Sequence, residues 1–209
     1  MKKGFTLAEV LITLGIIGVV AALVMPGLIN NYQKKVAVTR LAQTYSMLAQ
    51  AVKLSEVENG EMQNWLLTGA TTKDTQTFID TYLTPYLKNV KRVYLPYSSA
   101  PYPYYFRDGT PINGGTHYSI ALSNGVYLHF DQPGDGLSVR VDINGEQKPN
   151  MVGRDTFWFQ IFPQFTTYAK GTARNTLIQR CQSKVNSEWR QCTTLIELDG
   201  WQIKDDYPW

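Results

Sequence analysis

Residues 5–25 read FTLAEVLITLGIIGVVAALVM, an apolar run that carries a single charged side chain, Glu9. As a helix this run would be about 31 Å long at ~1.5 Å per residue, which matches the hydrocarbon core of a bilayer. Lys2 and Lys3 precede the run, so the positive-inside rule predicts a cytoplasmic N-terminus with the remainder of the chain on the far side. The sequence therefore predicts one membrane-spanning helix followed by a large head.

Three basic residues beyond the run weaken this asymmetry without reversing it. They are Lys34, Lys35 and Arg40. A long domain that follows a span is translocated largely regardless of its charge, so the predicted orientation is kept.

The composition fits a single globular head. The 209 residues leave room for one ordinary domain beside the long helix, and a chain that is 44% hydrophobic and 18% charged is not a disordered one. A formal net charge of +3 is too small to indicate nucleic-acid binding. Two histidines and two cysteines argue against most metal centres and thiol-based catalytic sites.

A removable secretory signal is the first alternative for residues 5–25. Such a signal needs an apolar run of about 7–15 residues and a small-x-small cleavage site. The run here is longer, and residues 25–28 (MPGL) supply no such site. An uncleaved signal anchor stays open, but it does not explain Glu9, because a carboxylate costs about 2.5–3.5 kcal/mol at mid-bilayer and normally has a partner.

The N-terminal residues KKGFTLAEVLI, at positions 2–12, resemble the signature of type IV pilins and of the pseudopilins of type II secretion systems. The resemblance implies that a prepilin peptidase cuts on the cytoplasmic face between Gly4 and Phe5 and methylates the new amine of Phe5. It also implies that Glu9 neutralises the Phe5 amine of a neighbouring subunit during filament assembly. The residues alone allow a second partner, since Glu9 lies one turn from the Phe5 amine of its own chain.

Small residues interrupt the apolar helix. Gly15 and Gly18, with two alanines nearby, offer surfaces on which helices approach closely, although such residues are common in any membrane helix. Pro26 lacks a backbone donor and should kink or interrupt the helix. In the resembling family a proline at this place marks where the helix bends or melts inside the filament, so the resemblance implies helix flexibility between Gly18 and Pro26.

Beyond Pro26 the pattern becomes amphipathic, with apolar residues three and four apart at Val38, Leu41, Tyr45, Leu48 and Val52. Asn59 and Gly60 form a C-terminal stop. The resemblance implies an α+β, pilin-like fold in which this long N-terminal helix, with a membrane half and an amphipathic half, packs on an antiparallel β-sheet head. The expected divisions are a cleaved leader (residues 1–4), a transmembrane and filament-core helix (5–26), the amphipathic half of that helix (27–60) and the head (61–209).

The head is predicted to hold a short helix and a small sheet. Residues 75–88 show helical spacing of aromatic residues, although Pro85 falls inside the segment. Alternation with period two and intervening turn residues predict a three-stranded antiparallel meander at 118–122, 126–130 and 137–143. The tail at 199–209 has the pattern of a last strand.

A tyrosine- and proline-rich stretch at residues 94–106 has two interpretations. Exposed rings could stack on a ligand or on DNA. Packing of the rings over the sheet is favoured, because the stretch itself contains no basic residue and Arg107 alone follows it directly.

Asp142, Asn144 and Asp155 form a weak candidate for structural calcium, because oxygen ligands in an acidic region suit this hard cation. The spacing excludes an EF-hand. A plain turn, held by side-chain hydrogen bonds and glycine conformations, is the favoured interpretation. No other cofactor is expected.

Cys181 and Cys192 lie in the part of the chain that the topology places outside the cytoplasm, and a disulfide between them is the default expectation. Its closure would contribute roughly 2.5–3 kcal/mol.

No enzyme is predicted, since the chain holds no Gly-x-Ser-x-Gly, phosphate-binding glycine loop or His-Glu-x-x-His motif. The resemblance implies a structural pilin or pseudopilin subunit of a type IV pilus or type II secretion filament. Its partners would be other such subunits, prepilin peptidase, the inner membrane and the assembly machinery. It would sit in the inner membrane as a single-pass protein with a periplasmic head, and then in a periplasmic or extracellular filament.

Two alternatives from the binding class stay open. One is a minor pilin whose head captures DNA or a surface. The other is a simple membrane-anchored binding domain, for which Glu9 would be dispensable.

Overall fold

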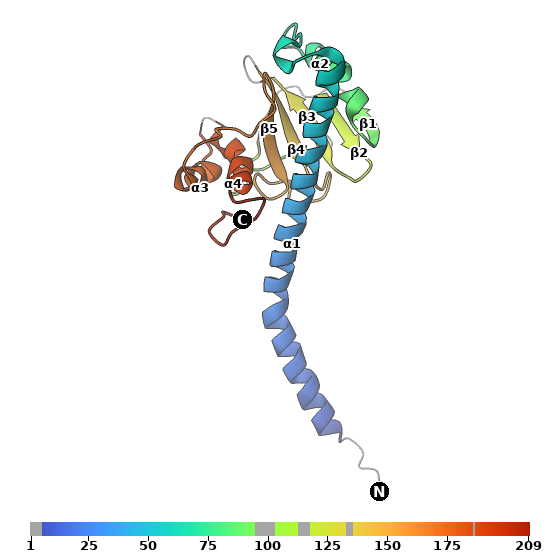
Figure 1. Cartoon of the computed structure of the whole chain (residues 1–209). Coiled ribbons are helices and arrows are strands. Elements are labelled where there is room, and N and C mark those ends of the chain that lie inside the picture. Colours follow the sequence, from blue (N-terminus) through green and yellow to red (C-terminus); the bar gives the residue numbers. More distant parts are fainter. Residues whose placement is uncertain (1–5, 95–102, 113–117, 133–135, 186) are drawn as a thin grey trace. The chain divides into compact units, whose positions relative to one another are not determined.

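Figure 1 shows the chain as a computed structural model that describes residues 6–94, 103–112, 118–132, 136–185 and 187–209. Its contacts divide it into two compact units, Met1–Val36 and Ala37–Trp209.

The first helix, α1 (Leu7–Asn59), runs through Pro26 without interruption. The sequence predicted a kink or a break at this proline. Pro26 removes one backbone donor, but the hydrogen bonds on both sides keep the helix continuous. The helix ends where Asn59 and Gly60 predicted, and Gly60 has the left-handed φ of 76° that commonly follows a helix.

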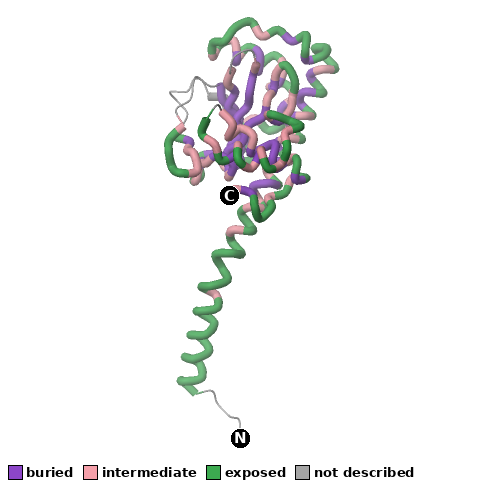
Figure 2. The backbone as a smooth tube through the Cα atoms, turned by 90° about the vertical axis from the view of Figure 1, so that its left-hand side faces the viewer, coloured by how far each residue is buried: buried purple, intermediate pink, exposed green. Residues whose placement is uncertain are grey.

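Within the first unit, α1 is solvent-exposed along nearly its whole length. Its most apolar 18-residue window has none of its residues buried. Figure 2 shows this exposure as an almost unbroken green tube, whereas the buried positions of the second unit gather around its sheet.

Within the second unit, α1 buries one face of the helix. The buried side chains recur at helical spacing, at Ala37, Val38, Leu41, Thr44, Leu48, Ala51, Val52 and Ser55. Tyr45, expected on this face, is half-buried and stacks on Phe165 with ring centroids 5.2 Å apart. Its ring also lies 5.6 Å from that of Phe159 in the sheet. This part of the helix lies across the sheet in Figure 1.

The sheet has five antiparallel strands in the order of the chain. They are β1 (Val90–Tyr94), β2 (Tyr118–Leu122), β3 (Tyr127–Asp131), β4 (Leu137–Asp142) and β5 (Thr156–Phe162). The α+β, pilin-like architecture is confirmed, and the predicted three-stranded meander forms the centre of the sheet.

The two outer strands were missed in the sequence. The predicted short helix stopped at residue 88 and residues 90–94 were not assigned to a strand, but they are extended because they pair with β2. In β5 the alternation is hidden, since Phe157, Trp158 and Phe159 are all buried although they point to opposite faces.

The second helix, α2 (Thr72–Tyr82), starts and ends earlier than predicted. Thr71 and Asp74 form a capping box that fixes its start. Pro85 belongs to a separate 3-10 turn, η2 (Thr84–Tyr86), since a proline is best tolerated at the start of such a turn. Another 3-10 turn, η1 (Met62–Asn64), lies between α1 and α2.

The C-terminal region is helical, and the predicted last strand at 199–209 is wrong. The chain forms α3 (Arg174–Gln182), the 3-10 turn η4 (Glu188–Gln191) and α4 (Cys192–Leu198), followed by an irregular tail. Long-range contacts hold that tail: Arg174 bonds both carboxylate oxygens of Asp199, at 2.7 and 2.8 Å, and it also bonds Asp206. An ion-pair network replaces the strand pairing that the alternation had indicated.

Candidate functional site

The start of α1 holds Glu9 in a hydrogen-bonded cap. The backbone N–H and the hydroxyl of Thr6 both donate to Glu9 Oε2 at 2.8 Å, and the Glu9 N–H donates to the Thr6 hydroxyl at 3.3 Å. This is a capping box, which satisfies backbone donors that the first turn of a helix leaves unpaired. Gly4 and Phe5, the predicted cleavage pair, lie outside the described residues.

Thr6 caps the helix, a role that the sequence analysis did not predict. A threonine followed three residues later by a glutamate, just before an apolar run, is the capping-box pattern and was present in the sequence. The structure thus gives Glu9 a local partner. Both bonds from Thr6 reach Oε2, and among the described residues no donor bonds Oε1.

The apolar surface of α1 in the first unit is large and uncovered. Its large apolar side chains between residues 7 and 29 are between 43% and 80% exposed. By length and composition α1 is the one helix in the described part of the chain that is able to cross a membrane. An exposed apolar surface of this extent indicates burial in a membrane or against other chains.

The glycines of this segment leave open space. A Cβ placed on Gly15, Gly18 or Gly27 would meet nothing within 4 Å. Glycine inside a helix costs about 1 kcal/mol relative to alanine, and within the described part of the chain no packing at these three residues offsets that cost. The space is consistent with close approach by another helix.

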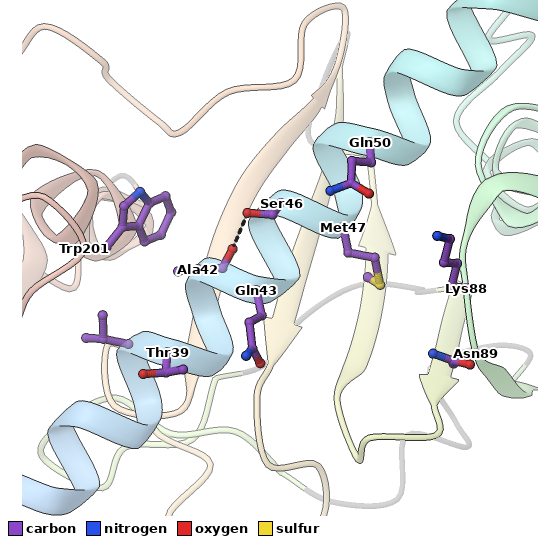
Figure 3. Close-up of a pocket in the computed structure, with 10 residues that line it drawn as sticks. Thr39, Ala42, Gln43, Ser46, Met47, Gln50, Lys88, Asn89 and Trp201 are labelled. Atoms are coloured by element: carbon purple, nitrogen blue, oxygen red, sulfur yellow. Dashed lines mark hydrogen bonds between the residues drawn. The ribbon is translucent and has the colours of Figure 1, made fainter.

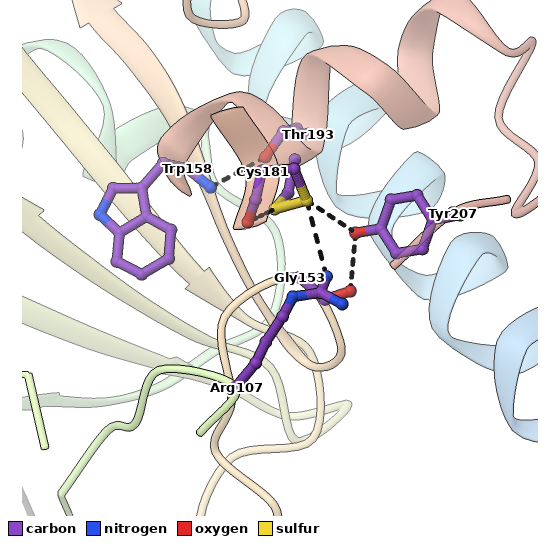
Figure 4. The surroundings of a disulfide bond; sticks show 7 residues. Arg107, Gly153, Trp158, Cys181, Thr193 and Tyr207 are labelled. Atoms are coloured by element: carbon purple, nitrogen blue, oxygen red, sulfur yellow. Dashed lines mark hydrogen bonds between the residues drawn. A yellow bond between two sulfur atoms is a disulfide. The ribbon is translucent and has the colours of Figure 1, made fainter. Parts of the chain in front are cut away.

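The predicted disulfide between Cys181 and Cys192 is confirmed, and it joins α3 to the start of α4. Figure 4 shows its surroundings: Arg107 Nη2 lies 3.5 Å from Cys181 Sγ, and the Tyr207 hydroxyl donates to the Gly153 carbonyl at 2.7 Å. Burial lowers the pKa of Arg107, and the neighbouring Tyr207 counteracts part of this shift. The disulfide is therefore a packed structural element of the head.

The candidate calcium residues lie together and form turns. Asp142 Oδ1 accepts hydrogen bonds from the N–H groups of Asn144, at 3.1 Å, and Gly145, at 2.7 Å. Asp155 accepts from two backbone N–H groups, at 2.8 and 2.5 Å, and from the Asn144 amide at 3.3 Å. Burial raises the pKa of Asp155 despite these bonds. Among the described residues no group of three or more His, Cys, Asp or Glu side chains has an arrangement that could hold a metal ion.

Part of the tyrosine-rich stretch packs on the sheet. Tyr104 is 3% exposed, its ring lies 3.6 Å from the Arg140 guanidinium carbon, and its hydroxyl contacts His129. His129 and Arg140 pair across β3 and β4 on the face of the sheet opposite α1. Tyr97 and Tyr102, from the same stretch, lie outside the described residues.

A shallow groove of about 610 Å³ follows the exposed side of α1 in the second unit (Figure 3). Val38, Ala42, Met47 and Trp201 make its lining mainly apolar, amides and hydroxyls add hydrogen-bonding groups, and Lys88 supplies its one formal charge.

Comparison with family models covers residues 1–25 and 27–176. A family model described as "Family of unknown function (DUF6613)" matches residues 27–176. The chain belongs to this family. In this DUF6613 protein, residues 1–25 match the prokaryotic N-terminal methylation motif. The N-terminal segment is thus that of a type IV pilin or pseudopilin.

Two kinds of curated relative are similar to this DUF6613 protein. Prepilin peptidase-dependent protein D of Escherichia coli strain K12 is 37% identical over 59 residues, which cover 28% of this chain and 40% of that protein. Two fimbrial proteins of Pseudomonas aeruginosa are each 37% identical over 75 residues, which cover 36% of this chain and 46% of theirs. The chain spans less than half the length of these relatives. No solved structure matches it.

Proposed function

We propose that this chain is a structural subunit of a type IV pilus or a type II secretion filament. Prepilin peptidase cuts it between Gly4 and Phe5, and the exposed apolar helix then packs against the same helix of other subunits. The carrying observation is that this helix has the methylation motif at its start and none of its most apolar window buried within the chain. The relatives named for prepilin peptidase and for fimbriae support the same proposal.

Before assembly, the protein spans the inner membrane once, with its N-terminus in the cytoplasm and its head in the periplasm. The length and apolarity of the helix support the span. The two lysines before it support the orientation.

Glu9 provides the assembly contact in this proposal. Its Oε2 accepts the capping bonds of its own helix, and among the described residues no donor bonds Oε1, which in this proposal accepts from a neighbour's Phe5 amine. Away from water an unpaired carboxylate is costly, so a neighbour that brings a positive amine stabilises the packed state. The alternative of a solitary anchor gives Glu9 only the capping role.

Processing is tested by the intact mass of the protein from cells with and without prepilin peptidase. We expect the loss of residues 1–4 and the gain of one methyl group only when the peptidase is present. The same N-terminus in both strains would refute the proposed processing.

Assembly is tested by two matched variants. Glu9→Gln removes the charge but keeps a side chain that forms a capping box, whereas Thr6→Ala removes the cap and keeps the carboxylate. Breaking a buried charge pair costs about 3–5 kcal/mol, so we expect filament yield to fall more than a hundredfold in Glu9→Gln. Loss of a cap costs about 1 kcal/mol, which predicts a fall of about fivefold in Thr6→Ala. If filament yield fell equally in the two variants, capping alone would explain the role of Glu9 and the proposed assembly contact would be refuted.

A further inference from the structure

The segment that follows the apolar run forms a ring of hydrogen-bond donors, which we call the collar. The collar is residues 30–35, with the sequence NNYQKK, and all six lie in α1 within the first unit. Each of its side chains carries a donor, and none is acidic. Tyr32, three residues after Ile29, is 70% exposed, and the last apolar residues before the collar, Leu28 and Ile29, are 67% and 53% exposed.

The collar surrounds the helix. Consecutive residues of an α-helix are about 100° apart, so six of them cover more than one full turn and point in all directions. A protein partner contacts one face of a helix and needs donors only there. A lipid leaflet surrounds a spanning helix, so the distribution of donors favours lipid over protein as the occupant.

The collar lies in a long part of α1 whose charged residues are all basic. Between Glu9 and Glu56 the sequence contains no acidic residue, and its charged residues are Lys34, Lys35, Arg40 and Lys53. Two of these four lie in the collar. The positive-inside rule does not account for lysines on the head side of the span, so they need another explanation.

We propose that the collar binds the phosphate groups of anionic phospholipids in the leaflet on the head side of the membrane. The apolar residues 7–29 would extend about 34 Å at ~1.5 Å per residue, which places the collar at the level of the headgroups. At this level a tyrosine ring sits with its hydroxyl toward water, and lysine ammonium groups reach the phosphates.

In a filament subunit, as proposed above, this lipid contact also regulates assembly. Only this regulatory role rests on the proposed function. Cleavage after Gly4 removes Lys2 and Lys3, so the collar then holds the lysines nearest to the span. A subunit that leaves the bilayer for a filament must release these headgroups. Membranes rich in anionic lipid would therefore retain the subunit more strongly than neutral ones.

The test measures which lipids surround the full chain in a bilayer. Lys2→Gln and Lys3→Gln are introduced first, because those lysines would attract the same lipids at the opposite leaflet. The protein is reconstituted in phosphatidylcholine, and spin-labelled phosphatidylglycerol or phosphatidylcholine reports the lipids held at its surface. We expect a preference for phosphatidylglycerol of about fivefold for each lysine that contacts a headgroup, lost in molar salt.

Variants assign the preference to the collar. K34Q with K35Q should abolish it and K34R with K35R should keep it, whereas K53Q, at an exposed lysine near the end of α1, should have no effect. An unchanged preference in the double glutamine variant, or no preference in the parent chain, would overturn the proposal. The measurement needs neither peptidase nor filament. The lipid preference can therefore be absent while the proposed function holds, and it can be present while the proposed function is refuted.

Discussion

α1 contains two segments that differ in what covers them. In residues 7–29 the large apolar side chains are at least 43% exposed, whereas between residues 37 and 55 eight side chains are buried against the head. The first segment is apolar on all sides and the second on one face, in agreement with this difference. Apolarity on every side of a helix indicates partners outside the chain, and a single apolar stripe indicates a partner within it.

The largest expected effect comes from a buried position in the second segment. Leu48 is fully buried, so Leu48→Ala should lower the free energy of unfolding of the head by about 2–5 kcal/mol. Leu14, which is 60% exposed, is the matched control, and Leu14→Ala should leave the melting temperature of the head unchanged. Thermal unfolding of the full chain, followed by near-ultraviolet circular dichroism, measures both. A similar loss in both variants would remove the distinction between the segments.

Removal of the disulfide is expected to rank next. Cys181→Ser with Cys192→Ser opens an 11-residue loop and should destabilise the head by about 2.5–3 kcal/mol, mainly through the freer unfolded chain. Denaturant unfolding of the head, with and without reductant, measures the effect. Reductant should lower the stability of the wild type to that of the double variant and leave the double variant unchanged. If reductant does not change the wild type, the disulfide contributes little to the stability of the head.

Two glycines sharpen the comparison. Gly153 has a φ of +72°, and a Cβ there would collide with the Arg107 guanidinium and approach Cys192 Sγ and the Tyr207 hydroxyl to 2.9 Å. Gly153→Ala should destabilise the head by about 1–3 kcal/mol. Gly18→Ala should spare the head, since nothing lies within 4 Å, and should lower filament yield if neighbouring helices use that space. Head melting temperature and filament yield, measured on both variants, test this; an unstable head in Gly18→Ala would contradict it.

The pH dependence of the head should reveal the C-terminal ion pairs. The hydrogen bond from Arg174 lowers the pKa of Asp199, and Lys204 adds to the shift. Because the folded-state pKa lies below the ordinary value of about 3.9, this carboxylate stabilises the fold above that pH. The contribution is lost as the pH falls through the lowered value. Unfolding measured between pH 6 and about 2 should lose less stability in Asp199→Asn than in wild type.

The smallest effect is expected from calcium. Asp142 and Asp155 already accept backbone hydrogen bonds, so calcium or a chelator should leave the melting temperature unchanged. Asp155→Asn should lower the melting temperature equally in both conditions. A calcium-dependent rise in the wild type that Asp155→Asn abolishes would restore the metal site.

Several features could be predicted because neighbouring residues encode them. The amphipathic spacing located the buried face of α1, and strand alternation with turn residues located β2, β3 and β4. The capping box of Thr6 and Glu9 is equally local, because it depends only on the three-residue spacing between them, so it too was open to prediction.

The C-terminal region could not be predicted in this way. Its alternation resembled a strand, but Arg174 binds Asp199 from 25 residues away, and Tyr207 binds the Gly153 carbonyl from 54 residues away. Such contacts have no local pattern, and they override a weak local preference.

By itself, the sequence determined the apolar helix, its methylation motif, the amphipathic continuation and the cysteine pair, because each depends on composition or spacing within one segment. Only the tertiary structure decided the outer strands β1 and β5, the helices around the disulfide, and the burial of His129 and Arg140 on the second face of the sheet. The physical reason is that hydrogen bonds and burial between distant segments determine those features. A sequence pattern shows only the periodicity within one segment.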